Sequence, residues 1–171
     1  MRVGILTISD RSSRGERPDT SGPAIAEYLR SRLTWDAAAT AVVPDELPAI
    51  CETLIDWSDR LHLDVVLTTG GTGFSPRDVT PEATRAAVER EAPGIPEALR
   101  AASLRITPHA MLSRAAAGIR GRTLIVNLPG NPKAIRENLD VLLPVLPHAI
   151  ELLQELPDAE AGHDRPRSLR A

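Results

Sequence analysis

Four short runs of apolar residues along the chain predict the strands of a buried sheet. Each run is short, rich in aliphatic residues and followed by a polar segment, which is typical of strands rather than helices. The predicted strands are Val3–Ile8, Ala37–Val43, Leu63–Thr68 and Leu124–Asn127.

Apolar residues recur at helical spacing in the segments between these runs. The predicted helices are one that starts at Thr20–Pro23, then Leu47–Leu61, Pro81–Glu91, Gly94–Thr107 and Pro132–Leu156. The last is expected to bend or split around Pro144 and Pro147. Ser9–Asp19 is expected to be a polar loop, and Ala110–Ala117 fits neither pattern. Because strands and helices alternate, the pattern predicts an α/β sandwich with a mostly parallel sheet.

Composition narrows the class of protein. The 171 residues are enough for one sizeable domain and not comfortably for two. A net charge of −3 argues against a general nucleic-acid binder, and no apolar run approaches the ~20 residues of a membrane span. Cys51 is the only cysteine, so no intramolecular disulfide can form. Together with the absence of a signal peptide, this favours a reducing cytoplasm.

The most informative segment runs from Thr68 to Ala83. It places a Gly- and Thr-rich turn, Gly70–Gly73, directly after a predicted strand and shortly before Asp78 and a helix start. Such a turn exposes backbone N–H groups and hydroxyls that suit a phosphate or another anion. It has neither the glycine spacing of a dinucleotide fingerprint nor the Lys-Ser/Thr pair of a P-loop. The glycines alone are equally well explained by a tight structural turn.

Three acidic residues follow the first three predicted strands. Asp10 and Asp45 come after the first two strands, and Asp78 comes after the glycine turn. Because the carboxyl ends of parallel strands meet at one edge of a sheet, we expect these carboxylates to converge there. By residue type alone, Asp45 is more simply a turn or cap residue. Thr80 is a better helix cap than Asp78, since Pro81 then occupies the first helical position. Asp78 is thereby left free to hold Mg²⁺ beside a phosphate.

A second strand-then-turn segment, Asn127–Pro132, resembles the first in its layout. Its Pro and Gly residues either shape the loop or aim backbone N–H groups at a ligand, and Lys133 is either a phosphate contact or a surface residue. Two such turns point to a nucleotide or phosphorylated ligand at the carboxyl edge of the sheet. Cys51 is expected in the core. The histidines, which lack metal-ligand spacing, are His62, His109, His148 and His163.

In their order along the chain, these motifs resemble those of the molybdopterin-binding domain that is shared by bacterial Mog and MoaB proteins and the G domain of gephyrin. The resemblance extends from Val3 to Leu156. Its six landmarks are Ile8–Arg11, Val43–Glu46, Thr68–Gly73, Arg77–Ala83, Met111–Arg114 and Asn127–Pro132.

The resemblance implies a three-layer α/β/α sandwich with a mixed, mostly parallel sheet, assembled as a homotrimer. A single domain is expected over residues 1–156, followed by a polar and disordered tail over residues 157–171. The implied activity is molybdopterin adenylyltransferase, an enzyme of molybdenum cofactor biosynthesis. It converts molybdopterin and Mg-ATP to adenylyl-molybdopterin and pyrophosphate, with hand-over of the product to a molybdenum-insertion protein.

By position, Asp45 and Asp78 match the two acidic residues that are associated with catalysis in this family, and they are the expected Mg²⁺ ligands. The nucleotide- and pterin-phosphate-binding segments are matched by Ser9, Asp10, Gly70, Gly71, Thr72 and Gly73. The surroundings of the pterin pocket are matched by Ser113, Asn127, Pro129 and Gly130.

One other function stays open, and a second has no support. A non-catalytic molybdopterin carrier or scaffold of the same fold would share these motifs, although the two filled acidic positions favour the enzyme. An unrelated nucleotide-binding phosphatase or kinase has no support, because neither a P-loop nor a phosphatase nucleophile motif is present.

Overall fold

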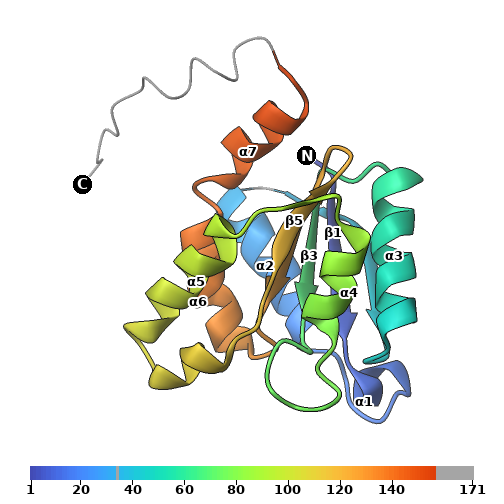
Figure 1. Ribbon diagram of the computed structural model, residues 1–171, viewed down its shortest axis with the longest axis vertical. Coiled ribbons are helices and arrows are strands. Elements are labelled where there is room, and N and C mark those ends of the chain that lie inside the picture. Colours follow the sequence, from blue (N-terminus) through green and yellow to red (C-terminus); the bar gives the residue numbers. More distant parts are fainter. Residues whose placement is uncertain (34, 157–171) are drawn as a thin grey trace.

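A six-stranded sheet lies at the centre of the computed structural model, which describes residues 1–33 and 35–156 (Figure 1). Its strands are β1 (Val3–Ile8), β2 (Ala37–Val43), β3 (Val65–Thr69), β4 (Arg90–Glu91), β5 (Ala117–Arg120) and β6 (Thr123–Leu128), in the order β2-β1-β3-β6-β5-β4. The first four strands in that order run parallel, whereas β5 and β4 are added antiparallel. The sheet is therefore mixed and mostly parallel, as predicted.

Helices cover both faces of this sheet and complete three layers (Figure 1). They are α1 (Asp10–Ser13), α2 (Ser21–Leu33), α3 (Leu47–Asp59), α4 (Thr80–Ala87), α5 (Gly94–Leu104), the 3-10 helix η1 (Pro108–Leu112), α6 (Pro132–Leu142) and α7 (Leu146–Leu153). Helices α2, α5, α6 and α7 pack in one apolar cluster with the sheet, and α3 and α4 in another. The sandwich predicted from the alternation of elements is confirmed.

Alternate residues of the central strands face the two helical layers. Ile5, Leu67 and Val126 are neighbours in register and pack in the cluster of α2 and α6. The adjacent positions Val66 and Ile125 pack instead against α3 and α4. Because both faces are covered, these strands are mostly apolar, which is why their sequences show runs rather than alternation.

Several predicted ends shift by one to three residues, and three segments differ more from the prediction or had none. The helix expected over Pro81–Glu91 ends at Ala87, because Val88 is extended and the following residues pair with β5. The unassigned segment Ala110–Ala117 holds the end of η1 and the start of a β5–β6 hairpin, which turns at Gly121. The loop Ser9–Asp19 includes the single turn α1, whose Ser12 N–H donates to Ser9 Oγ at 3.2 Å.

The predicted break in the last helix is present, because α6 ends at Leu142 and α7 begins at Leu146. The tail predicted to be disordered lies outside the described residues. Among the helices of residues 1–33 and 35–156, none is both long and apolar enough to cross a bilayer.

Candidate active site

The carboxyl ends of the four parallel strands meet at one edge of the sheet, the lower edge in Figure 1. The chain leaves β1 at Ser9, β2 at Pro44, β3 at Gly70 and β6 at Pro129. The segments that sequence reasoning selected therefore lie together, because parallel pairing brings the strand ends into register.

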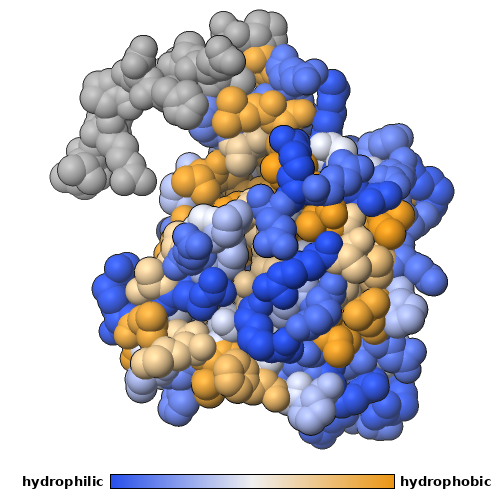
Figure 2. Space-filling model, in the orientation of Figure 1, coloured by the Kyte–Doolittle hydropathy of each residue, from blue (hydrophilic) through white to orange (hydrophobic). Residues whose placement is uncertain are grey.

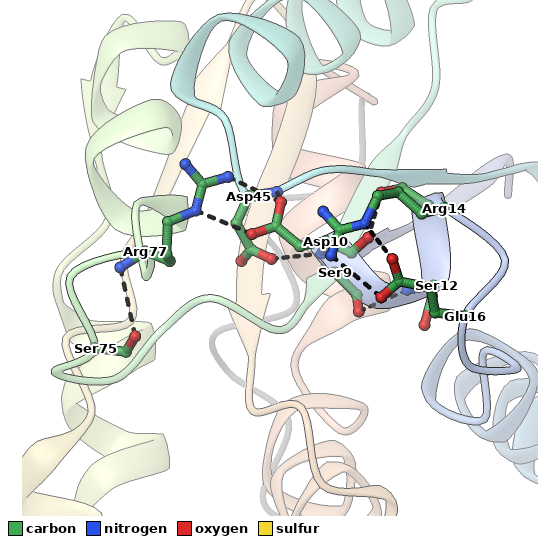
Figure 3. Close-up of polar contacts among 9 residues, drawn as sticks. Ser9, Asp10, Ser12, Arg14, Glu16, Asp45, Ser75 and Arg77 are labelled. Carbon is green, nitrogen blue, oxygen red and sulfur yellow. Dashed lines mark hydrogen bonds and ion pairs between the residues drawn. The ribbon is translucent and has the colours of Figure 1, made fainter.

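Asp10 and Asp45 bind one another's backbone at this edge. The Asp10 N–H donates to Asp45 Oδ2 at 2.8 Å, and the Asp45 N–H donates to Asp10 Oδ1 at 3.1 Å. Arg77 reaches from the loop after β3 to Asp10 (Figure 3). Its Nε and Nη2 donate to the two oxygens of Asp10 at 2.9 and 2.8 Å, which is the bidentate geometry of a strong arginine–carboxylate pair.

The two carboxylates differ in their ionisation. Burial raises the pKa of Asp45 above its ordinary value, and the nearby charges of Asp10 and Asp78 raise it further. The hydrogen bond from Arg77 instead lowers the pKa of Asp10. Asp45 is thus a carboxylate without a cation of its own, beside two other carboxylates. Such a group gains stability from a cation or a hydrogen-bond donor brought by a ligand.

The turn Gly70–Gly73 passes between Asp45 and Asp78. Gly71 has a φ of +62°, and a Cβ placed on it would lie 3.0 Å from Asp45 Oδ1. A Cβ on Gly73 would lie 2.9 Å from Asp78 Oδ2. Side chains at these two positions would therefore collide with the carboxylates that flank the turn. Glycine keeps the backbone close to both.

Two predictions about the start of α4 need correction. Thr80 does not cap the helix with its side chain, because its hydroxyl donates to the Gly70 carbonyl at 2.9 Å, and Val79 occupies the cap position. Asp78 does not cap the helix either, but it is not free of partners. Its Oδ2 accepts the Ser75 N–H at 3.0 Å. Thr80 fastens the glycine turn to the helix, and Asp78 orders its own loop.

Asp45 and Asp78 are carboxylates next to the glycine turn, which is the donor type that Mg²⁺ prefers. Within residues 1–33 and 35–156, no group of three His, Cys, Asp or Glu side chains could hold a metal ion. The protein would therefore supply two carboxylates, with phosphate oxygens and water completing the shell, which is the manner in which Mg²⁺ is commonly bound.

Two cavities border the glycine turn, one at its Gly70 end and the other at its Thr72–Gly73 end. The larger has a volume of about 420 Å³, and its lining includes Thr72, Gly73, Ser113, Asn127 and Pro129. The smaller has a volume of about 160 Å³, and its lining includes Ser9, Ser12, Thr69, Gly70 and Gly130. Eight of the predicted site residues are thus divided between the two cavities.

The larger cavity has apolar surroundings. Pro96 and Leu99 of α5 contribute to its wall. Exposed apolar side chains gather on the neighbouring α5–η1 segment, in the lower left of Figure 2. They belong to Leu104, Ile106, Met111 and Leu112. Arg100 and Glu137 add charge to the lining, so that a flat ring with polar edges would find both apolar and charged contacts there.

Asn127 lies beneath the larger cavity and is almost wholly committed to internal bonds. Its Oδ1 accepts the Ala116 N–H at 3.0 Å, and its Nδ2 donates to the hydroxyls of Thr68 and Thr84 at 2.9 and 2.8 Å. The side chain is 1% exposed. Asn127 therefore links β6, β3 and α4, and it forms the floor of the cavity.

The sequence model of the family described as "Probable molybdopterin binding domain" matches residues 4–148. The chain belongs to the molybdopterin-binding domain family. It is 43% identical over 157 residues to the molybdopterin adenylyltransferase of Helicobacter pylori (strain J99), across 90% of this chain and 88% of that protein. The chain resembles the structure of the molybdopterin biosynthesis enzyme MoaB of Thermus thermophilus, with 56% identity, a TM-score of 0.84 and coverage of 90% and 96%.

A longer relative shares the same domain. The chain is 49% identical over 164 residues to gephyrin of Dictyostelium discoideum, across 91% of this chain but only 23% of gephyrin. This member of the molybdopterin-binding family thus spans about a quarter of that relative's length. The resemblance that the landmarks indicated is confirmed.

Sequence reasoning missed two arginines that shape the site of this family member. Arg77 pairs with Asp10, and Arg114 donates to two carbonyls of the loop that follows the glycine turn. Both residues stood inside quoted landmarks, next to the residues that were selected. Their side-chain partners lie 67 residues away for Arg77 and 32 or more for Arg114, and no local spacing rule could have assigned them.

Proposed function

We propose that this protein is a molybdopterin adenylyltransferase of molybdenum cofactor biosynthesis. The observation that carries the proposal is the position of Asp45 and Asp78 beside a glycine turn whose two ends border two cavities. Membership of the molybdopterin-binding family supports it, as does the name of a bacterial relative that this chain matches over most of both lengths.

The two cavities suit different parts of the substrates. The larger, with its apolar walls and with Arg100 and Glu137 in its lining, would take the flat pterin ring. The smaller is lined by the hydroxyl residues Ser9 and Ser12 and by glycine, which suits phosphate groups of the nucleotide. The glycine turn between them would then lie where the two substrates meet.

The reaction joins two phosphates. An oxygen of the terminal phosphate of molybdopterin bonds to the α-phosphorus of ATP, the bond from that phosphorus to the β-phosphate oxygen breaks, and pyrophosphate leaves. A transfer of this kind depends on alignment and charge neutralisation more than on a protein nucleophile. Backbone N–H groups of Gly71–Gly73 would bind non-bridging oxygens, and Arg77 would add a cation at the same edge.

Magnesium is part of the proposal, with Asp45 and Asp78 as its protein ligands. When bound, Mg²⁺ supplies positive charge that offsets the charge of the phosphates. The raised pKa of Asp45, which reflects burial and the neighbouring carboxylates, is consistent with a site that gains from a cation. We further propose a cytoplasmic homotrimer that passes its product to a molybdenum-insertion protein.

An adenylylation assay tests the function. Purified protein would be given molybdopterin, ATP and Mg²⁺, and adenylyl-molybdopterin would be measured with pyrophosphate. We expect product from the wild type, and a loss of about 100-fold or more in Asp78→Asn, which removes a charge without changing shape. An Asp78→Asn variant that is folded and fully active would contradict the assigned role. No product, with molybdopterin still bound tightly, would support a carrier or scaffold instead.

A further inference from the structure

Arg114 binds both ends of the loop that carries Asp78. Its Nε donates to the Gly73 carbonyl at 2.7 Å, where the loop begins, and its Nη2 donates to the Asp78 carbonyl, where the loop ends. Its backbone N–H donates to the Thr72 carbonyl at 2.9 Å. The Arg114 side chain thus joins two carbonyls that are five residues apart and closes the loop, in an arrangement that we call the clasp.

Glu82 holds the guanidinium in this position. Nη1 of Arg114 donates to Glu82 Oε1, which lies in the first turn of α4. The other oxygen, Glu82 Oε2, is buried and has no hydrogen-bond partner among the described residues. The carboxylate therefore relies on Arg114 for its neutralisation. The planar fork of arginine can serve two carbonyls and a carboxylate at once, whereas a lysine ammonium cannot reproduce this geometry.

The loop between the two clasped carbonyls has few other attachments. Phe74 at its start is 65% exposed. Ser75 and Asp78 bond mainly to each other, through the Ser75 N–H to Asp78 Oδ2 and the Asp78 N–H to the Ser75 carbonyl. Within the described part of the chain, an ion pair between Arg77 and Asp10 joins the tip of this loop to the edge of the sheet, and its arginine is exposed. Thr80 closes the base of the loop through its N–H to the Gly71 carbonyl at 3.1 Å and its hydroxyl to the Gly70 carbonyl at 2.9 Å. Between that base and the Arg77–Asp10 pair at the tip, Arg114 is the side chain that joins the two ends of the segment carrying Asp78.

Arg114 also connects this loop to the larger cavity. Its neighbour Ser113 lines that cavity, together with Thr72 and Gly73, which Arg114 binds. We propose that Arg114 is a positioning residue, which fixes the loop of Asp78 relative to the cavity so that both substrates meet in the reactive alignment. The inference rests on the proposed function, because it assigns Arg114 to the adenylyl transfer.

Kinetics test the catalytic part. A displacement of about 1 Å can cost about 100-fold in rate, so we expect kcat of Arg114→Gln to fall by about that factor. The KM values for ATP and molybdopterin should change little, because most of the cavity lining is intact. Arg114→Lys retains the charge but not the fork, and it should recover only a minor part of kcat. A lysine variant with wild-type kcat would overturn the proposal.

Hydrogen–deuterium exchange tests the clasp without any substrate. In Arg114→Gln, the amides of residues 74–79 should exchange faster, while those of β1, β3 and β6 stay protected. Arg120→Gln is a matched control, because Arg120 likewise pairs with a carboxylate, Asp59, and donates to a carbonyl, that of Ala87. Exchange of residues 74–79 and kcat should be unchanged in this control.

The two measurements separate the possible failures. Unchanged exchange in residues 74–79 of Arg114→Gln, or faster exchange throughout the sheet, would overturn the local clasp. Faster local exchange with an unchanged kcat would overturn the positioning role. A wild type that makes no product would overturn the proposed function and the catalytic role with it, while the exchange experiment would still decide whether Arg114 holds the loop.

Discussion

Asp45 at one edge of the sheet and Asp59 at the other are compensated in opposite ways. At the carboxyl edge, Asp45 is partly buried beside Asp10 and Asp78, and its pKa is raised. At the amino edge, Asp59 is paired with Arg120 through two hydrogen bonds of 2.9 and 2.6 Å, which lower its pKa. One edge leaves a carboxylate poorly compensated, and the other neutralises it.

Cavity size does not distinguish the two edges. The amino edge has a cavity of about 770 Å³, larger than either cavity beside the glycine turn. Its acidic lining residues have internal partners, since Asp64 accepts the Arg2 N–H at 2.6 Å and the Gln154 Nε2 at 2.7 Å. Uncompensated charge beside a close backbone turn is therefore a better indicator of a functional site here than volume.

Replacing Asp45 or Asp59 with asparagine should give the largest difference in activity between the two edges. Asp45→Asn removes the charge at the proposed reaction site and keeps an acceptor for the Asp10 N–H, so we expect adenylylation to fall by about 100-fold or more. Asp59→Asn weakens an exposed pair with Arg120, and activity should stay within about twofold. The measurement is kcat/KM for both substrates. Equal losses in the two variants would contradict the distinction between the edges.

Two glycines with left-handed backbones offer the next comparison. A Cβ on Gly71 would lie 2.3 Å from Thr80 Oγ1, whereas one on Gly121, with a φ of +54°, would meet nothing within 4 Å. Both alanine variants should lose about 1–2 kcal/mol of unfolding free energy from the backbone conformation alone. Only Gly71→Ala should also lose activity, because it displaces the turn from Asp45 and Thr80.

Denaturant unfolding and the adenylylation assay measure the two effects separately. A Gly71→Ala variant that is destabilised to the same extent as Gly121→Ala, and equally active, would show that the turn tolerates displacement. The close passage of the backbone between the carboxylates would then have no part in the reaction.

The sequence specified the parallel core better than the antiparallel edge of the sheet. Strands β1 and β2 were predicted to the residue. β1 is buried on both faces, which gives an apolar run, whereas β2 lies at the edge of the sheet and alternates half-buried and exposed residues. Strand β4 has two exposed residues, and β5 begins in a run of alanine and arginine. Their pairing is set by the hairpin and by contacts with the core, which leave no periodic pattern in the sequence.

Part of the candidate site could likewise be predicted from the sequence, and part of it could not. Convergence of Asp10 and Asp45 could be expected from parallel topology, and the structure confirms it by their reciprocal bonds. The partners of Arg77 and Arg114 could not be predicted from the sequence. Long flexible side chains have many acceptors within reach, and only the folded backbone selects among them. The role of Thr80 was mistaken because its hydroxyl bonds to the Gly70 carbonyl across the turn, a contact that only the folded backbone creates.

Stability should depend on pH with opposite sign at the two edges, although the effect is smaller than those on activity. The folded-state pKa of Asp45 is raised, so the folded protein holds that proton more tightly than the unfolded chain. Its contribution to stability is therefore lost as the pH rises from the ordinary pKa of 3.8 through the raised value. Asp59 has a lowered pKa, and its contribution is present above 3.8 and lost as the pH falls through the lowered value.

Denaturant unfolding between about pH 3 and pH 7 would measure this difference in the wild type and the two asparagine variants. As the pH rises, Asp45→Asn should gain stability relative to the wild type, because it lacks the penalty of ionising a partly buried carboxyl. Over the same rise, Asp59→Asn should lose stability relative to the wild type, because it lacks the ionised partner of Arg120. A gain in both variants, or a loss in both, would show that the two carboxylates are equally compensated in the folded protein. The carboxyl edge would then no longer be distinguished by its electrostatics.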